Sequence, residues 1–146
     1  MPTVSNVTKV LFVCVHNAGR SRMAEAMLRH LGGSHFEVTS AGFEPRQVDT
    51  YVARAMASID MPIEHSAAQP SVFELFRAGR HFHYVISVCD EIERERCPIF
   101  PGVTQRLSWT FPDPTSAIGT PVERLARTAE VRDAIRTRLE EWLQSF

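Results

Sequence analysis

The chain has 146 residues, of which 44% are apolar and 23% charged, and its formal net charge is −1 at pH 7. These values are typical of one soluble domain with a hydrophobic core, and they argue against general binding to nucleic acid or to anionic membranes. Its apolar runs are much shorter than the ~20 residues of a membrane span, and the run that follows residues 1–8 is too short for a secretory leader. We therefore expect a cytoplasmic monomer with one domain over residues 1–146.

Apolar patterning predicts that strands and helices alternate along the chain. In chain order, we expect a strand over 9–14, a helix over 21–31, a strand over 35–40, helices over 48–59 and 71–78, a strand over 83–88, a loop over 90–102, an edge strand over 103–109, a loop over 110–119 and a long helix over 121–144. Ala41-Gly42 is expected to end the second strand. This alternation predicts an α/β fold with a parallel sheet and helices on both faces.

Residues 14–21, Cys-Val-His-Asn-Ala-Gly-Arg-Ser, connect the first expected strand to the first expected helix. A strand, a short loop and a helix start gather backbone N–H groups around a concavity that the positive end of the helix also faces. These groups and Arg20 would lower the pKa of the Cys14 thiol below its usual ~8.5, and Ser21 can donate its hydroxyl to the same sulfur. The pattern predicts a nucleophilic thiolate beside a bound tetrahedral oxyanion, whereas the alternative is a buried structural cysteine.

The other loop residues are expected to bind that oxyanion. The planar guanidinium of Arg20 suits bidentate contact with two of its oxygens. Asn17 suits a positive φ, and Gly19 allows the backbone to approach the ligand. His16 either contacts the substrate or faces solvent. The expected substrate-binding residues are Val15, His16, Asn17, Ala18, Gly19 and Arg20.

Two further residues outside this loop, Cys89 and Asp113, are candidates for a catalytic role. The chain has only three cysteines, too few for a disulfide scaffold and without a spacing typical of zinc sites. Cys14 and Cys89 both end expected buried strands, and neighbouring strands lie ~5 Å apart, within the reach of a disulfide. Asp113 precedes Pro114 and is either a turn residue or the general acid that protonates a leaving oxygen. No metal site is expected.

These motifs together resemble a known family. The stretch Val10 to Met27, the turn Ser40-Ala41-Gly42 and the segment Phe111-Pro112-Asp113-Pro114 resemble the low-molecular-weight protein tyrosine phosphatase fold. Cys89 with Cys97-Pro98-Ile99 is similar to one branch of that family, the arsenate reductases that thioredoxin recycles. The resemblance implies a flavodoxin-like three-layer domain with strand order 2-1-3-4 and no cofactor.

The resemblance also implies a mechanism. Cys14 attacks arsenate held by Arg20 and the loop, Asp113 protonates the departing oxygen, Cys89 attacks the Cys14 sulfur as arsenite leaves, and Cys97 then attacks Cys89. Thioredoxin would reduce the resulting disulfide, with mycothiol or glutaredoxin as alternative reductants. The charged segment 90–96 is expected to be exposed and to rearrange during this relay.

Two departures from the family qualify these expectations. The phosphatase branch usually carries aromatic residues after its Asp-Pro, where this chain has Thr115-Ser116, so a tyrosine phosphatase is the alternative activity. Some members bind potassium at positions that match Asn17, Glu25 and Ser40. Ala67-Ala68 stands where those members have an acidic residue, which argues against a potassium site here.

Overall fold

The computed structural model describes residues 7–89, 97–103, 105–116 and 118–146. Its strands are β1 (Thr8–Cys14), β2 (Phe36–Gly42), β3 (Tyr84–Ser87) and β4 (Gln105–Ser108). Its helices are α1 (Arg20–Gly32), α2 (Thr50–Ala57), α3 (Val72–Arg77) and α4 (Pro121–Leu143), with short 3-10 turns η1 (Gly33–His35) and η3 (Pro114–Ser116). Each expected strand and helix is present, with ends that differ by one or two residues.

The four strands form one parallel sheet in the order β2-β1-β3-β4, as the resemblance implied. β1 lies at the centre, with Cys14 in register with Gly42 of β2 and Val13 in register with Ser87 of β3. The expectation that Ala41-Gly42 ends the second strand is wrong. β2 runs through Gly42 because that residue still pairs with the end of β1.

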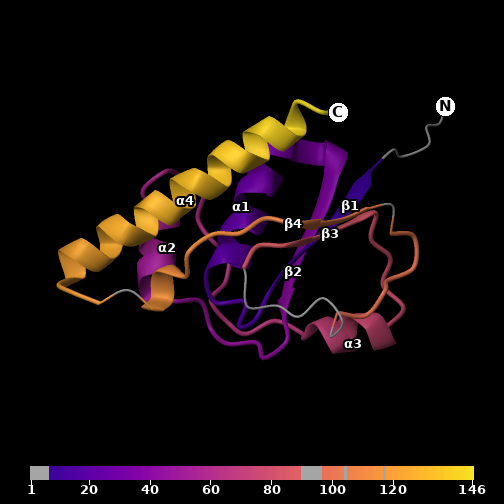
Figure 1. Ribbon diagram of the computed structural model, residues 1–146, viewed down its shortest axis with the longest axis horizontal. Coiled ribbons are helices and arrows are strands. Elements are labelled where there is room, and N and C mark those ends of the chain that lie inside the picture. The colour runs from indigo at the N-terminus through magenta and orange to yellow at the C-terminus, as the bar shows by residue number, and fades with distance from the viewer. Residues whose placement is uncertain (1–6, 90–96, 104, 117) are drawn as a thin grey trace.

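Side chains of β1 alternate between the two faces of the sheet and so contribute to two separate apolar clusters. Val10, Phe12 and Cys14 face the cluster that α1, α2 and α4 cover, which we call the α1-side cluster. Leu11 and Val13 face the cluster beneath α3, which we call the α3-side cluster. Figure 1 shows the long α4 and the short α3 on opposite sides of the strands. Helices on both faces are therefore confirmed.

Hydrogen-bonded caps fix where three helices begin. The Asp49 carboxylate accepts from the backbone N–H groups of Tyr51 and Val52 at the start of α2. Ser71 with Glu74 and Thr120 with Glu123 form reciprocal capping boxes at the starts of α3 and α4. In the part of the chain that the structure describes, no helix combines the length and the apolar character that a membrane crossing requires.

Candidate active site

The loop between β1 and α1 is anchored by its carbonyl groups. The carbonyl oxygens of Val15, His16 and Ala18 accept hydrogen bonds from the backbone N–H groups of Glu44, Arg46 and Asp49, at 2.8, 2.9 and 2.9 Å. In a trans peptide the carbonyl and the following N–H point in opposite directions. The N–H groups of His16, Asn17 and Gly19 are therefore directed away from the 44–49 segment.

Cys14 lies where these N–H groups and the start of α1 meet. It is the last residue of β1, is 4% exposed and belongs to the α1-side cluster. Gly19 is the N-cap of α1 and supplies no side-chain cap, so the first-turn N–H groups keep their capacity to bind an anion. None of the three cysteines, Cys14, Cys89 and Cys97, forms a disulfide bond in the structure.

Asn17 holds the turn of this loop. Its φ is 52°, as the sequence predicted, and its side chain is fully buried. Its Nδ2 donates to Ser21 Oγ at 2.8 Å and to Ser40 Oγ at 3.0 Å, which ties the loop to α1 and to β2. The ring of His16 instead lies at the surface, with Nδ1 3.3 Å from the carbonyl oxygen of Glu44.

Gly42 permits the close approach between the loop and β2. A Cβ atom at this position would lie 2.7 Å from the carbonyl oxygen of Val15 and 3.0 Å from the backbone nitrogen of Asn17. Both are backbone atoms that cannot move without displacing the loop. The loop conformation therefore requires glycine here.

Arg20 and Asp113 meet although they are far apart in the sequence. Arg20 opens α1 and is 4% exposed, and its Nη1 donates to the carbonyl oxygen of Phe111 at 2.8 Å. Its Nη2 lies 3.9 Å from Oδ2 of Asp113, whose side chain is 30% exposed. The other oxygen, Oδ1, accepts from the backbone N–H and the hydroxyl of Thr115, at 2.9 and 2.7 Å. These bonds fix the carboxylate beside the loop.

Cys89 joins Cys14 on the same side of the sheet. It lies two residues beyond the end of β3, is buried and belongs to the α1-side cluster together with Cys14. The backbone N–H of Val88 donates to the carbonyl oxygen of Val13 at 3.1 Å, so the chain still follows β1 at this point. The structure thus places Cys14 and Cys89 at the carboxyl ends of two adjacent strands, β1 and β3.

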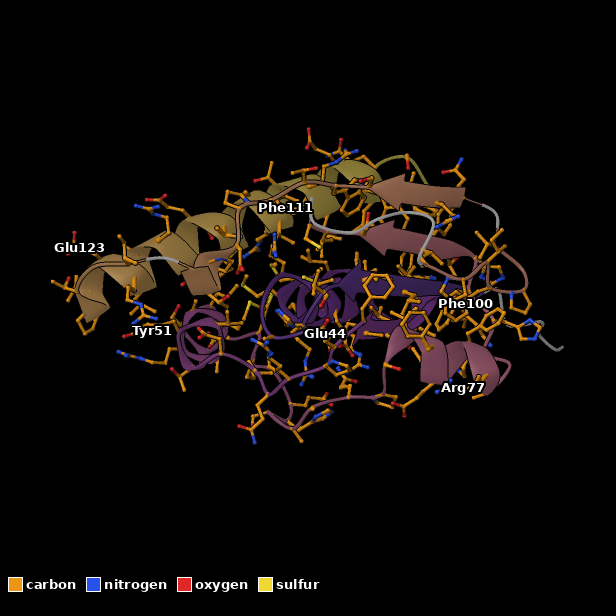
Figure 2. The ribbon with its side chains drawn as sticks, turned by 60° about the horizontal axis from the view of Figure 1, so that its bottom comes forward. Glu44, Tyr51, Arg77, Phe100, Phe111 and Glu123 are labelled. Atoms are coloured by element: carbon orange, nitrogen blue, oxygen red, sulfur yellow. The ribbon has the colours of Figure 1, made fainter. Side chains whose placement is uncertain are left out.

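Cys97 lies on the opposite side of the sheet. It is 8% exposed and belongs to the α3-side cluster with Phe82 and Phe100. Figure 2 shows Phe100 next to α3, whereas Phe111 of the other cluster lies toward α4. Burial raises the pKa of the Cys97 thiol, and the nearby Arg106 guanidinium, which hydrogen-bonds to it, acts in the opposite direction. The expected exposure of segment 90–96 lies outside the described residues.

The sequence did not single out Arg22, which lies directly behind the loop. Its guanidinium donates to Asn17 Oδ1 at 3.4 Å, to the carbonyl oxygen of Ala67 at 3.3 Å and to the carbonyl oxygen of His65. Gln69, with its amide oxygen facing the guanidinium, accepts from Arg22 Nη1 at 2.9 Å. A basic residue in the first turn of a helix gives no signal in the sequence that it will be buried.

These contacts decide the question of potassium. Asn17, Glu25 and Ser40 do come together, as the resemblance implied. However, the Ser40 hydroxyl donates to Glu25 Oε1 and accepts from Asn17, while Asn17 Oδ1 accepts from Arg22. The Arg22 guanidinium already places a cation at Asn17 Oδ1, and Glu25 Oε1 accepts from Ser40, so these residues do not fit a potassium ion.

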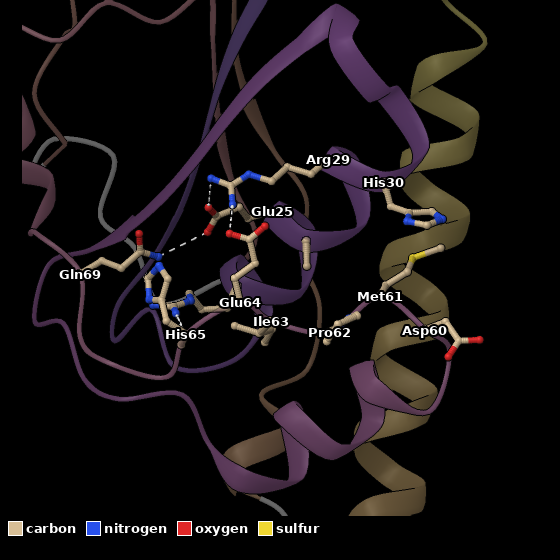
Figure 3. Close-up of a pocket in the computed structure, with 12 residues that line it drawn as sticks. Glu25, Arg29, His30, Asp60, Met61, Pro62, Ile63, Glu64, His65 and Gln69 are labelled. Carbon is tan, nitrogen blue, oxygen red and sulfur yellow. Dashed lines mark hydrogen bonds and ion pairs between the residues drawn. The ribbon is translucent and has the colours of Figure 1, made fainter.

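A cavity of about 290 Å³ opens next to this network, between α1 and residues 60–69 (Figure 3). Its wall includes the ion pair between Glu25 and Arg29, whose Oε2 and Nη2 atoms are 2.7 Å apart, and Glu64, 3.7 Å from the same guanidinium. Figure 3 shows Glu64, His65 and Gln69 along one rim. The cavity borders the network from outside and does not include Cys14.

The fold and this site match a known family. The family model of the low-molecular-weight phosphotyrosine protein phosphatases matches residues 9–146, and the chain belongs to that family. A solved tyrosine phosphatase of Erwinia amylovora shares the fold with a TM-score of 0.71 at 17% identity, covering 96% of this chain and 93% of that chain.

Relatives with higher identity place the chain in the arsenate reductase branch. An arsenate reductase of Halalkalibacterium halodurans is 30% identical over 140 residues, which cover 96% of this chain and 98% of that protein. The structure of a thioredoxin-dependent arsenate reductase of Corynebacterium glutamicum matches with 31% identity and a TM-score of 0.66. That match covers 99% of this chain and 66% of the longer Corynebacterium chain.

Proposed function

We propose that this chain reduces arsenate to arsenite through a relay of its three thiols, and that thioredoxin reduces the disulfide that the relay leaves. The observation that carries the proposal is the placement of Cys89 beside Cys14 in one buried cluster at the ends of adjacent strands. The chain's similarity to arsenate reductases, one of them thioredoxin-dependent, supports it. A phosphatase of this fold needs only Cys14, Arg20 and Asp113.

The loop binds the oxyanion in the first stage. The N–H groups of residues 15–19, those of the first turn of α1 and the guanidinium of Arg20 surround a tetrahedral anion and neutralise its charge. The same groups favour the thiolate form of Cys14. Ser21, whose oxygen accepts from Asn17, directs its own proton toward the sulfur.

The first chemical step forms a bond between Cys14 sulfur and arsenic. The thiolate attacks, an arsenic–oxygen bond breaks, and Asp113 gives its proton to the departing oxygen, which leaves as water. The carboxylate is well placed for this role because Arg20, which binds the anion, lies 3.9 Å from it.

The second step transfers the electrons. The Cys89 thiolate attacks the Cys14 sulfur, a Cys14–Cys89 disulfide forms, and the sulfur–arsenic bond breaks with its electron pair remaining on arsenic. Arsenic is thereby reduced from the +5 to the +3 state and leaves as arsenite. The two sulfurs supply the two electrons.

The third step carries the oxidation away from the loop. The Cys97 thiolate attacks the Cys89 sulfur, a Cys89–Cys97 disulfide forms, and Cys14 leaves as a thiolate ready for another cycle. Because Cys89 and Cys97 belong to clusters on opposite sides of the sheet, this step requires one of them to leave its present position. Thioredoxin reduces the product, with mycothiol or glutaredoxin as alternative reductants.

Thiol mapping after arsenate treatment tests the relay. The reduced protein is treated with arsenate, alkylated and digested, and the cysteine peptides are identified by mass spectrometry. We expect a Cys89–Cys97 disulfide in the wild type, and we expect the Cys89→Ala variant to give no arsenite turnover with thioredoxin. Turnover in that variant would show that the relay is wrong. Efficient cleavage of an aryl phosphate by a wild type that ignores arsenate would favour the phosphatase alternative.

A further inference from the structure

Arg22 is a fully buried cation that the proposed chemistry does not use. It is 2% exposed and is the largest fully buried side chain in the described part of the molecule. Burying a charge is costly unless its hydrogen-bonding groups are satisfied. A buried guanidinium must therefore be hydrogen-bonded, and its acceptors show which parts of the chain it holds in place.

The acceptors come from two separate parts of the chain, the loop after β1 and the segment before α3. They are the side chain of Asn17 in the loop, the carbonyl oxygens of His65 and Ala67 in the segment before α3, and the side chain of Gln69. Burial lowers the pKa of the Arg22 guanidinium, and the nearby Glu25 carboxylate opposes that shift. The Arg22 guanidinium remains charged nonetheless, because arginine does not deprotonate in proteins.

The contact with Asn17 links this cation to the oxyanion loop. Asn17 adopts a left-handed conformation, with φ 52°, that most residues other than glycine avoid. Its side-chain amide is held at both ends, since Nδ2 donates to Ser21 and Ser40 while Oδ1 accepts from Arg22. Together with the backbone bonds from residues 44–49, that amide fixes the direction of the flanking N–H groups.

We propose that Arg22 is a positioning residue, an internal cation that fixes the Asn17 turn and with it the anion-binding N–H groups of the loop. Its side chain lies behind the loop and contacts Asn17 rather than the bound anion. The inference rests on the proposed function only in requiring that the loop binds an oxyanion.

Phosphate binding measures this role without any need for turnover. The probe is inorganic phosphate, measured by calorimetry and by protection of Cys14 against alkylation, with the Cys14 thiolate pKa followed by ultraviolet absorbance. We expect Arg22→Ala to weaken phosphate binding about tenfold or more, since one hydrogen bond to a charged group contributes about 1.5–3 kcal/mol. The pKa of Cys14 should rise in the same variant. The matched control is Arg77→Ala, an exposed arginine on α3, which should bind as the wild type does.

Two further measurements separate positioning from simple structural support. Millimolar guanidinium, compared with sodium chloride at equal concentration, should restore phosphate binding to Arg22→Ala. In an Asn17→Ala background, loss of Arg22 should weaken phosphate binding by less than twofold more, because the group that it positions is already gone. Additive losses in the two variants, or wild-type affinity in a folded Arg22→Ala protein, would overturn the inference.

The lysine variant covers the case in which Arg22→Ala does not fold. Arg22→Lys keeps the charge but lacks the planar set of donors, and we expect it to fold and to bind phosphate about three- to tenfold more weakly than the wild type. Unchanged affinity in this variant would contradict the inference. A wild type that binds phosphate but does not reduce arsenate would contradict the proposed function without contradicting the role of Arg22.

Discussion

The surroundings of Cys14 and of Cys97 differ in kind, although both thiols are buried. Cys14 ends a strand beside a loop whose polar side chains, Asn17 and Ser21, are buried and hydrogen-bonded to each other. Cys97 lies among the rings of Phe82 and Phe100 on the other side of the sheet. Burial raises the pKa of Cys97 and favours its neutral thiol, whereas the proposed mechanism requires a thiolate at Cys14.

This contrast indicates that the thiols on the two sides of the sheet have different roles in the proposed relay. A nucleophile that must attack a bound anion needs donors fixed in advance, because donors that reorient during the reaction add to the barrier. A thiol that reacts last, as proposed for Cys97, is protected from earlier reaction if it stays protonated and buried until Cys89 or Cys97 leaves its position. The following predictions test each side of this contrast.

The largest effect is expected from Asp113→Asn. Loss of the proton donor should lower kcat for arsenate reduction about 100- to 10,000-fold. Phosphate binding should be retained, because the substitution removes a negative charge next to Arg20. Steady-state kinetics and calorimetry measure the two quantities, and Asp133→Asn on α4 is the control. An Asp113→Asn variant with wild-type kcat would remove Asp113 from the mechanism.

A smaller loss is expected from Gly42→Ala. The added Cβ would push against the backbone of Val15 and Asn17, and a loop displaced by a fraction of an ångström should lower kcat/KM about tenfold to 100-fold. Overpacking should also lower the free energy of unfolding by about 1–3 kcal/mol.

Gly33→Ala separates the two effects of that substitution. Gly33, unlike Gly42, has a positive φ, of 58°, and a Cβ there meets open space. We expect thermal denaturation to show a modest loss of stability in this control and the kinetics to show unchanged activity. Equal losses of activity in both variants would indicate that a general loss of stability, not loop displacement, explains the effect of Gly42→Ala.

The smallest effect concerns Cys97 and Arg106. Because burial raises the pKa of Cys97, its thiolate fraction should increase as pH rises, and formation of the Cys89–Cys97 disulfide should accelerate between about pH 7 and 9. Arg106→Gln removes the charge that lowers this pKa, so the rise should move to higher pH and the rate near neutrality should fall tenfold or less. Rapid-quench alkylation measures this step. A rate that does not respond to pH or to the substitution would contradict the assigned environment.

Local signals in the sequence predicted the strands and the Cys14 loop. Continuous apolar residues identified the strands around Val10 and Val85, and the spacing from Cys14 to Arg20 identified the anion loop with the positive φ of Asn17. These features depend on neighbouring residues, which is why periodicity and spacing were sufficient.

Features that depend on tertiary packing were not predicted. The side of the sheet that Cys97 occupies depends on how residues 97–100 pack beneath β3 and α3. In the sequence, Arg22 cannot be told apart from other basic residues of a helix. It is a buried cation because residues 65–69 pack against it and accept its hydrogen bonds. The continuation of β2 through Gly42 likewise depends on its partner, Cys14.

Trapping the second step is the most direct test of the relay across the sheet. The Cys97→Ala variant, treated with arsenate and digested under non-reducing conditions, should accumulate a disulfide between the peptides that contain Cys14 and Cys89, together with one equivalent of arsenite. A variant that forms no such disulfide, or that continues to release arsenite catalytically with thioredoxin, would contradict the account.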